Sequence, residues 1–308
     1  MGIASFDEQE TIGRALDHVL SQRKDLSFEV IVVAGGSDST VDIAKRYQSD
    51  LPDFVVVEEG ARRGKPWAIN QILARARGDV IVLTDGDVYL GRSSISRLVK
   101  AFDDPEVGAA TARVLAANDR AHVFGFWANF LFDAANRRRE RHARLGVLYH
   151  LSGYLSAIRK GIVRGIPEDS LADDATIGMM VRLSGYQVAY VPESTVFVKF
   201  PENLSDFFLQ KRRTMAGAYQ VQQRFGVHDR GVLQEAQEGL LWGFRYCRSL
   251  SECFYFIGLA LARVAAWALA FWDVRVIRRD FKDLWRPAPS TKHLTEITRG
   301  LRDAGDHT

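Results

Sequence analysis

The sequence predicts an α/β fold with a mostly parallel central sheet flanked by helices. Over residues 1–90, short apolar runs typical of strands buried on both faces alternate with segments of helical spacing. This alternation is typical of βαβ units, and therefore of a parallel sheet. The chain has 308 residues, of which 47% are apolar and 26% charged, so it can form one large α/β domain and an appendage.

The elements of the first half follow from the positions of the apolar residues. Residues 1–6 read as the end of a strand whose beginning is missing or unusually short. Residues 7–11 are expected to open a helix, because acidic side chains suit the positive end of a helix dipole. That helix carries an apolar stripe made of Ile12, Ala15, Leu16, Val19 and Leu20. Further strands are predicted at 28–34, 51–58, 79–84 and 107–114, and further helices from residue 41, at 66–76 and at 93–102.

The second half contains two apolar segments that are followed by basic residues. Residues 121–135 are rich in aromatic side chains and lead into five arginines between 137 and 144. This segment is either a core helix with a solvated basic end or a helix on an anionic membrane surface. Residues 254–272 are apolar apart from Arg263 and long enough to cross a bilayer, although a central arginine opposes insertion by about 3 kcal/mol. Spanning a membrane, lying in its interface and packing as a soluble helix are all consistent with this segment.

Charge and cysteine content narrow the class of protein. The chain has 41 basic and 38 acidic residues, and this net charge of +3 is too balanced to indicate a nucleic-acid-binding protein. Cys247 and Cys253 match no zinc or redox spacing, so a reducing, cytoplasmic compartment is expected. No signal peptide is apparent. The turn at 35–37 lacks the G-x-G-x-x-G spacing of dinucleotide-binding folds, and no P-loop motif occurs.

Two carboxylates close one of the predicted strands. Residues 80–83 are a short apolar run, and Asp85, Gly86 and Asp87 follow it closely. Side chains at the carboxyl ends of strands face the crevice in which open α/β sheets bind ligands, and Gly86 permits a sharp turn there. Two carboxylates with room for water and phosphate oxygens suit a hard cation, so Asp85 and Asp87 are predicted to bind Mn²⁺ or Mg²⁺. The alternative is a polar turn with no ligand.

Four short motifs occur in a characteristic order. They are Ser5-Phe6-Asp7-Glu8, the segment 33–40, the segment 64–70 and the Asp-Gly-Asp turn at 85–87. Together they resemble the nucleotide-binding half of glycosyltransferase family 2, the inverting transferases of the GT-A fold, whose segments read approximately A-Y-N-E, V-D-D-G-S-x-D-x-T, G-K-x-x-A-L-N and D-x-D. The resemblance implies a GT-A nucleotide-diphospho-sugar transferase domain over 1–225 and a helical C-terminal region over 226–308.

The resemblance also implies a nucleotide-diphosphate sugar as the donor substrate. Ala34 and Gly35 stand where the family usually has acidic residues that contact the base, so uridine cannot be assumed. Phe6 replaces a frequent tyrosine and is either a base-stacking ring or a core residue. Lys65 is either a phosphate ligand or a solvated loop residue. The implied donor-binding residues are Ser5, Phe6, Glu8, Gly35, Ser37, Lys65, Asn70, Asp85, Gln210 and Arg213.

Two later segments extend the resemblance. Residues 151–159 are similar to the segment that borders the acceptor, which implies that Gly153 and Tyr154 lie on the acceptor side. Residues 210–214 resemble the Q-x-x-R-W motif of processive members, but Thr214 replaces the tryptophan that would stack on a growing chain. This replacement argues against a processive polymer synthase. Arg213 either meets the leaving diphosphate, for which a guanidinium is well shaped, or is a surface arginine.

An acidic pair resembles the part of the family that carries the catalytic base. Asp173 and Asp174 fall at the start of a predicted helix that ends near Gly185, before a strand at 187–191. An inverting transfer needs a carboxylate that takes the proton of the acceptor hydroxyl. The resemblance implies that Asp174 is this base, with Asp173 as its orienting neighbour or helix cap. Repulsion between the two acids raises a pKa, whereas the helix dipole lowers it, so pKa alone does not choose between them.

These observations lead to one expected function and two alternatives. We expect a metal-dependent inverting glycosyltransferase that acts on an acceptor hydroxyl or phosphate. The apolar segment at 254–272 suggests a lipid-linked acceptor, and we expect the enzyme at the cytoplasmic face of a membrane. The first alternative is a nucleotidyltransferase that makes an activated sugar, but residues 1–20 lack the Gly-rich, Arg-containing phosphate loop that it needs. The second is a catalytically inactive family member that acts as a membrane-bound scaffold.

Overall fold

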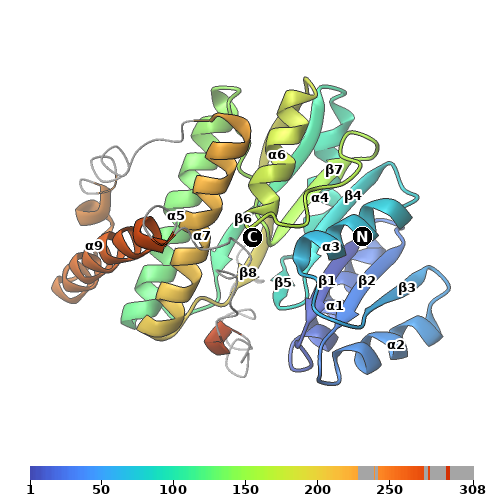
Figure 1. Ribbon diagram of the computed structural model, residues 1–308, viewed down its shortest axis with the longest axis horizontal. Helices are drawn as coiled ribbons and strands as arrows, with labels where there is room; N and C mark the ends of the chain where they lie inside the picture. Colours follow the sequence, from blue (N-terminus) through green and yellow to red (C-terminus); the bar gives the residue numbers. More distant parts are fainter. Residues whose placement is uncertain (228–238, 240–241, 274–276, 278–288, 292–308) are drawn as a thin grey trace.

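A mixed sheet forms the centre of the computed structural model (Figure 1), which describes residues 1–227, 239, 242–273, 277 and 289–291. Within these residues the strand order is β3-β2-β1-β4-β7-β6-β8-β5. β1 to β4 are mutually parallel, whereas β7 is antiparallel to both of its neighbours and β5 is antiparallel to β8. The strands are β1 (Gly2–Phe6), β2 (Val30–Gly35), β3 (Phe54–Glu59), β4 (Val80–Asp85), β5 (Val88–Leu90), β6 (Val107–Ala116), β7 (Leu155–Arg159) and β8 (Gln187–Val198).

The strands confirm the predicted fold class, with two additions. β5 was not predicted, because three residues are too few to show a period. β8 continues beyond the predicted segment at 187–191. Its pairing with β6 is interrupted after Val191 and resumes at Thr195, so Pro192 lies in the interruption. A proline has no N–H to donate to a neighbouring strand, and such an interruption is where a sheet tolerates it.

Helices cover both faces of the sheet (Figure 1). α1, α2 and α4 pack on one face, where Leu16 of α1 and Leu98 of α4 belong to the same apolar cluster as Val32 of β2. α3 and α6 pack on the other, where Trp67 and Ile177 belong to a second cluster with the intervening residues of β2. The helices are α1 (Ile12–Ser21), α2 (Thr40–Asp50), α3 (Lys65–Arg75), α4 (Ser94–Lys100), α5 (Val123–Arg144), α6 (Asp173–Leu183), α7 (Leu204–Phe225) and α9 (Leu250–Phe271), with short 3-10 turns at Gln22–Lys24, Ala101–Asp103 and Pro289–Thr291.

The first helix begins later than predicted. α1 starts at Ile12, and no acidic residue lies in its first turn. Asp7 instead adopts a left-handed conformation with φ of 53°, and its carboxylate accepts a hydrogen bond of 2.7 Å from the backbone N–H of Ser37. The prediction that residues 7–11 open the helix is therefore wrong, because Asp7 links the ends of β1 and β2 instead.

The aromatic segment and the arginine cluster belong to a single helix, α5. Phe126, Trp127 and Phe130 are buried in a cluster that also contains Phe207 of α7 and Phe256 of α9. The aromatic half of α5 is therefore core, and the alternative of a membrane-surface helix does not hold for it. α9 packs beside α5 and α7 at one end of the molecule (Figure 1).

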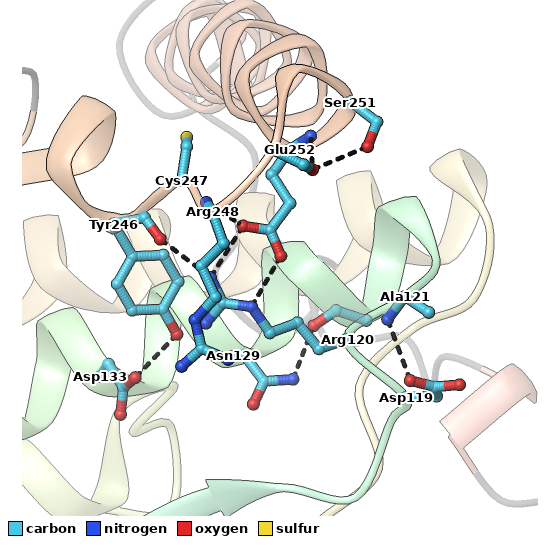
Figure 2. A network of polar contacts seen from close by, with 12 residues as sticks. Asp119, Arg120, Ala121, Asn129, Asp133, Tyr246, Cys247, Arg248, Ser251 and Glu252 are labelled. Atoms are coloured by element: carbon cyan, nitrogen blue, oxygen red, sulfur yellow. Dashed lines mark hydrogen bonds and ion pairs between the residues drawn. The ribbon is translucent and has the colours of Figure 1, made fainter.

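Arg120 links the sheet region to this C-terminal part (Figure 2). Its Nε and one terminal nitrogen donate to the two carboxylate oxygens of Glu252 at 2.8 and 3.0 Å, and its guanidinium lies 4.1 Å from the ring centre of Tyr246. Tyr246 in turn donates a hydrogen bond to Asp133 of α5. A two-pronged, half-buried pair of this kind holds its partners in a defined orientation.

The division of the chain into a domain over 1–225 and a helical region over 226–308 stays a prediction.

Candidate active site

The Asp-Gly-Asp turn lies at the carboxyl end of β4, beside the end of β1. Asp85 pairs with Ala4 in the sheet, and the Gly86 N–H donates to the Ala4 carbonyl at 3.3 Å. A Cβ on Gly86 would lie 2.5 Å from both Ser5 Oγ and Glu8 Oε2. The turn therefore passes so close to the end of β1 that only glycine fits between Asp85 and Asp87.

Ser5 and Glu8 support this turn from below. Ser5 is buried, and its hydroxyl donates to Glu8 Oε2 at 2.7 Å. The Glu8 N–H donates to Thr40 Oγ1, which ties the segment after β1 to the start of α2. Their contacts in this structure position the Asp-Gly-Asp turn, and their predicted contacts with the sugar donor stay predictions.

Lys65 lies between the two predicted acidic centres, which are the Asp-Gly-Asp turn at 85–87 and the acidic pair at 173–174. It is the first residue of α3, and its ammonium lies 2.6 Å from Asp85 Oδ1 and 3.6 Å from Asp173 Oδ2. It also donates to the Gly153 carbonyl at 3.0 Å. Burial would lower the pKa of Lys65, but the charges of Asp173 and Asp85 raise it well above its usual value. Lys65 is therefore a charged, half-buried residue, and the alternative of a solvated loop lysine is wrong.

Asp173 and Asp174 begin α6, as predicted. Burial, and then the charge of Asp173, raises the pKa of the Asp174 carboxyl. Asp174 Oδ1 accepts a hydrogen bond of 2.7 Å from the Ala175 N–H, which opposes this rise. Burial also raises the pKa of Asp85, although Lys65 acts against it. The two acidic centres, almost ninety residues apart in the chain, thus lie within reach of one ammonium group.

Gly153 and Tyr154 lie between these centres. A Cβ on Gly153 would stand 3.5 Å from Asp174 Oδ2 and 3.6 Å from Lys65 Nζ, so this position borders both groups. Burial raises the pKa of Tyr154 to about 12, against the charge of the nearby Arg213. The backbone carbonyl of Tyr154 accepts a hydrogen bond from Thr84 Oγ1 at 2.6 Å, which fixes this segment to β4.

The motif at 210–214 lies on α7, and Arg213 faces the site. Burial raises the pKa of both Asp85 and Tyr154, and the positive charge of Arg213 opposes this rise, which places its guanidinium near these groups. Thr214 is exposed, and its hydroxyl donates back to the Gln210 carbonyl of the same helix. It therefore offers no stacking surface, and the sugar-donor role of Gln210 stays a prediction.

The predicted base-binding region lies at the ends of β1 and β2. The guanidinium of Arg62, an exposed residue, lies 4.7 Å from the ring centre of Phe6. Phe6 is itself only partly buried, so its ring is not enclosed in the core. A Cβ on Gly35 would come within 2.9 Å of Phe6 and within 2.7 Å of the Glu59 carbonyl, so only glycine fits. Position 35 therefore has no room for a side chain in this structure. Ser37 is held by its bond to Asp7.

Asn70 has a positioning contact in this structure. Its side-chain amide donates to the Ile166 carbonyl at 2.9 Å and accepts from the Ile166 N–H at 2.8 Å. It thereby holds the segment after β7 against α3. A contact between Asn70 and the sugar donor stays a prediction.

Asp85 and Asp87 are the carboxylates of the predicted metal site. Among the described residues, no three His, Cys, Asp or Glu side chains gather as a complete set of ligands. Two carboxylates on one tight turn nevertheless fit a cation such as Mg²⁺, which is usually bound by one or two carboxylates and takes its other oxygens from water and substrate phosphates. Lys65 already pairs with Asp85, so Asp87 is the first candidate ligand.

Sequence reasoning missed several residues around Asp174. Arg139 and Arg138 of α5 approach this side of the site, and Arg138 lies 3.0 Å from His150 Nε2. Basic residues on a helix resemble a solvated face in sequence, and His150 has no motif around it. Only the return of α5 alongside β6 brings them close to α6.

The sequence profile of glycosyl transferase family 2 matches residues 2–166 of the chain. The protein is a member of glycosyl transferase family 2. This confirms the family that the four motifs indicated.

Individual relatives extend the match. The chain is 25% identical over 224 residues to poly-beta-1,6-N-acetyl-D-glucosamine synthase of Staphylococcus aureus, covering 71% of this chain and 54% of that protein. It is 27% identical to an N-acetylglucosaminyltransferase of Rhizobium sp., covering 66% and 48%. The chain thus spans about half the length of the curated relatives it matches.

The fold also matches a solved structure. The mannosyltransferase PcManGT from Pyrobaculum calidifontis, in complex with GDP-Man and Mn²⁺, superposes with a TM-score of 0.60 at 21% identity, over 98% of this chain and 86% of that one. This similarity confirms the GT-A fold with a helical C-terminal part.

Proposed function

We propose that this family member is a metal-dependent inverting glycosyltransferase that moves a sugar from a nucleotide-diphosphate donor to an acceptor hydroxyl. The observation that carries the proposal is the position of Lys65 between two acidic centres, 2.6 Å from Asp85 and 3.6 Å from Asp173. One centre ends β4 and the other begins α6. Two separate carboxylate groups, one for a cation and one for a proton, are what such a transfer needs.

On the donor side, Asp87 and Asp85 would hold Mn²⁺ or Mg²⁺. When bound, the ion would supply positive charge that offsets the negative charge developing on the leaving diphosphate. Arg213 reaches the same region from α7 and would bind the leaving diphosphate, since a guanidinium matches phosphate oxygens with two parallel N–H groups. Lys65 would remain next to the same phosphates, since its ammonium lies 2.6 Å from Asp85.

On the acceptor side, Asp174 would act as the general base. Burial and Asp173 raise its pKa, which makes the carboxylate a stronger base than an exposed aspartate. The acceptor hydroxyl gives its proton to Asp174 as its oxygen bonds to the anomeric carbon. The bond from that carbon to the diphosphate then breaks, and the nucleoside diphosphate keeps the electron pair.

A panel of nucleotide sugars with Mn²⁺ tests this proposal. We expect release of nucleoside diphosphate from one or a few of them, slowly in water and faster with an acceptor. Formation of a nucleotide sugar from a nucleoside triphosphate and a sugar 1-phosphate would instead support the nucleotidyltransferase. Turnover of no donor would support the inactive scaffold.

We further propose that α9 contacts a membrane surface and brings the enzyme to a lipid-linked acceptor. By length and composition, α9 is long and apolar enough to span a bilayer. Its buried residues, which include Phe256, Leu259 and Ala262, recur on one face against α5 and α7, while large apolar residues such as Leu261 are exposed on the other. A helix with one face packed on protein and an apolar face exposed suits a position in the membrane interface.

A further inference from the structure

The basic half of α5 is fixed firmly beside the predicted base. Asn136 is buried, and its amide exchanges two hydrogen bonds with the backbone of Val114 in β6, at 2.7 and 3.2 Å. This bond anchors the helix to the sheet one turn before Arg139. Residues three positions apart lie on the same side of a helix, so Arg139 also points toward the sheet and the site.

Arg139 is a charged group with unused hydrogen-bonding capacity. Its Nε is buried and has no hydrogen-bond partner in the described part of the chain. One terminal nitrogen lies 3.4 Å from Asn136 Oδ1, which is a long contact for a charged donor. Burial lowers the pKa of the guanidinium, and the charge of Asp174 opposes that change. Arg139 therefore lies within electrostatic reach of the predicted base.

A purely structural role as the counterion of Asp174 does not explain this arrangement. Within the described residues, the two side chains form no ion pair within 4 Å, and Asp174 takes its recorded hydrogen bond from Ala175. A guanidinium withdrawn from water without a partner is costly, and direct pairing with the carboxylate would remove the cost. The buried Nε–H group without a partner indicates that Arg139 is placed to bind an anionic group other than Asp174.

A second cationic residue is held beside it. Arg138 lies 3.0 Å from His150 Nε2, and since a guanidinium can only donate, the imidazole nitrogen accepts. The ring of His150 lies against that of Tyr149, with ring centres 4.0 Å apart and the planes tilted by 33°. His150 lies close enough to Asp174 to affect its pKa. Two elements, α5 and the segment before β7, thus bring basic side chains to the acceptor side of Asp174.

We propose that Arg139, assisted by Arg138, binds a phosphate group on the acceptor, next to the hydroxyl that receives the sugar. This inference rests on the proposed function, because it assigns the acceptor side to Asp174. The fork of N–H groups on arginine matches phosphate oxygens in two parallel bonds. The acceptor phosphate is bound but does not react, and the hydroxyl beside it gives its proton to Asp174 during the transfer.

Binding of glycerol 3-phosphate to the full-length protein tests this inference. Mg²⁺ and pyrophosphate are added first to fill the donor side, and binding is measured by calorimetry. We expect glycerol 3-phosphate to bind and glycerol not to bind. Arg139→Gln should weaken binding at least tenfold, since hydrogen bonds to charged groups contribute about 1.5–3 kcal/mol. Arg141→Gln, which removes the same charge from an exposed position of the same helix, should leave the affinity unchanged.

A conservative variant and a lipid probe distinguish the possible results of this experiment. Arg139→Lys keeps the charge and should retain partial binding, so it reports on the site even if Arg139→Gln folds poorly. If only vesicles of phosphatidylcholine with phosphatidic acid bind, and Arg139→Gln but not Arg141→Gln weakens that binding, the phosphate belongs to a lipid acceptor. Equal binding by wild type and both Arg139 variants, or equal loss with Arg141→Gln, overturns the inference. Hydrolysis of nucleotide sugars by the unmodified protein, measured in parallel, tests the proposed function separately.

Discussion

Replacing Lys65 with methionine tests whether one ammonium group holds the acidic site together. Its Nζ lies 2.6 Å from Asp85 and 3.6 Å from Asp173. With an effective dielectric constant of about 20, Coulomb's law gives about 6 kcal/mol for the first pair and about 5 kcal/mol for the second, before the cost of desolvation. Removing one partner of a buried ion pair destabilises proteins by about 3–5 kcal/mol. We expect Lys65→Met to lower the free energy of unfolding by this amount at neutral pH.

The deficit should shrink as the pH falls. Burial raises the pKa of Asp85 and Asp174, so the folded state binds their protons at higher pH than the unfolded chain does. Each carboxylate therefore costs stability above its folded pKa, and that cost fades as the pH falls toward the unfolded value of about 4. Without Lys65 the folded pKa values rise further, so the variant should recover part of its stability at about pH 5.

Urea unfolding followed by circular dichroism, at neutral pH and at about pH 5, measures both effects. Lys45→Met is the matched control, because Lys45 lies 2.8 Å from Glu58 but both side chains are largely exposed. An exposed pair contributes at most about 1 kcal/mol. The reasoning is refuted if Lys65→Met costs no more than Lys45→Met, or if its deficit is the same at both pH values.

Three further predictions concern the metal, the base and the membrane. Asp87→Ala should abolish Mn²⁺-dependent binding of the nucleotide sugar while circular dichroism stays unchanged; unchanged affinity in calorimetry would remove the metal role. Asp174→Asn should keep donor binding but lower turnover by about a hundredfold or more, the usual contribution of a positioned base, and wild-type turnover would exclude Asp174. Leu261→Gln, at a position 68% exposed on α9, should weaken sedimentation with anionic liposomes about tenfold, whereas Leu183→Gln, 70% exposed on α6, should not; equal effects would argue against α9.

Much of the fold was determined by local sequence patterns. Apolar runs such as 80–83 predict buried strands because both faces of a parallel strand are covered, and β4 lies there. The Asp-Gly-Asp turn and the acidic pair at 173–174 were also recognisable, because their residue types and their positions next to a strand or helix end carry the chemistry. Short or irregular features escaped, such as β5 and the left-handed Asp7, because their conformations depend on partners distant in sequence.

The tertiary structure alone decided which charged residues meet. Lys65 could have been a solvated loop residue until the start of α3 brought it between Asp85 and Asp173. In the sequence, the arginines of α5 form one basic cluster. The hydrogen bond from Asn136 to β6 fixes the rotation of the helix, so that Arg139 is turned inward while neighbours such as Arg141 are exposed. Sequence patterns encode burial and periodicity within one element, whereas the distance between charges on different elements is set by how those elements pack. The carboxylates were therefore predictable from the chain, and Lys65 was a candidate, but the contact of Lys65 with both acidic groups and the approach of Arg139 were not predictable.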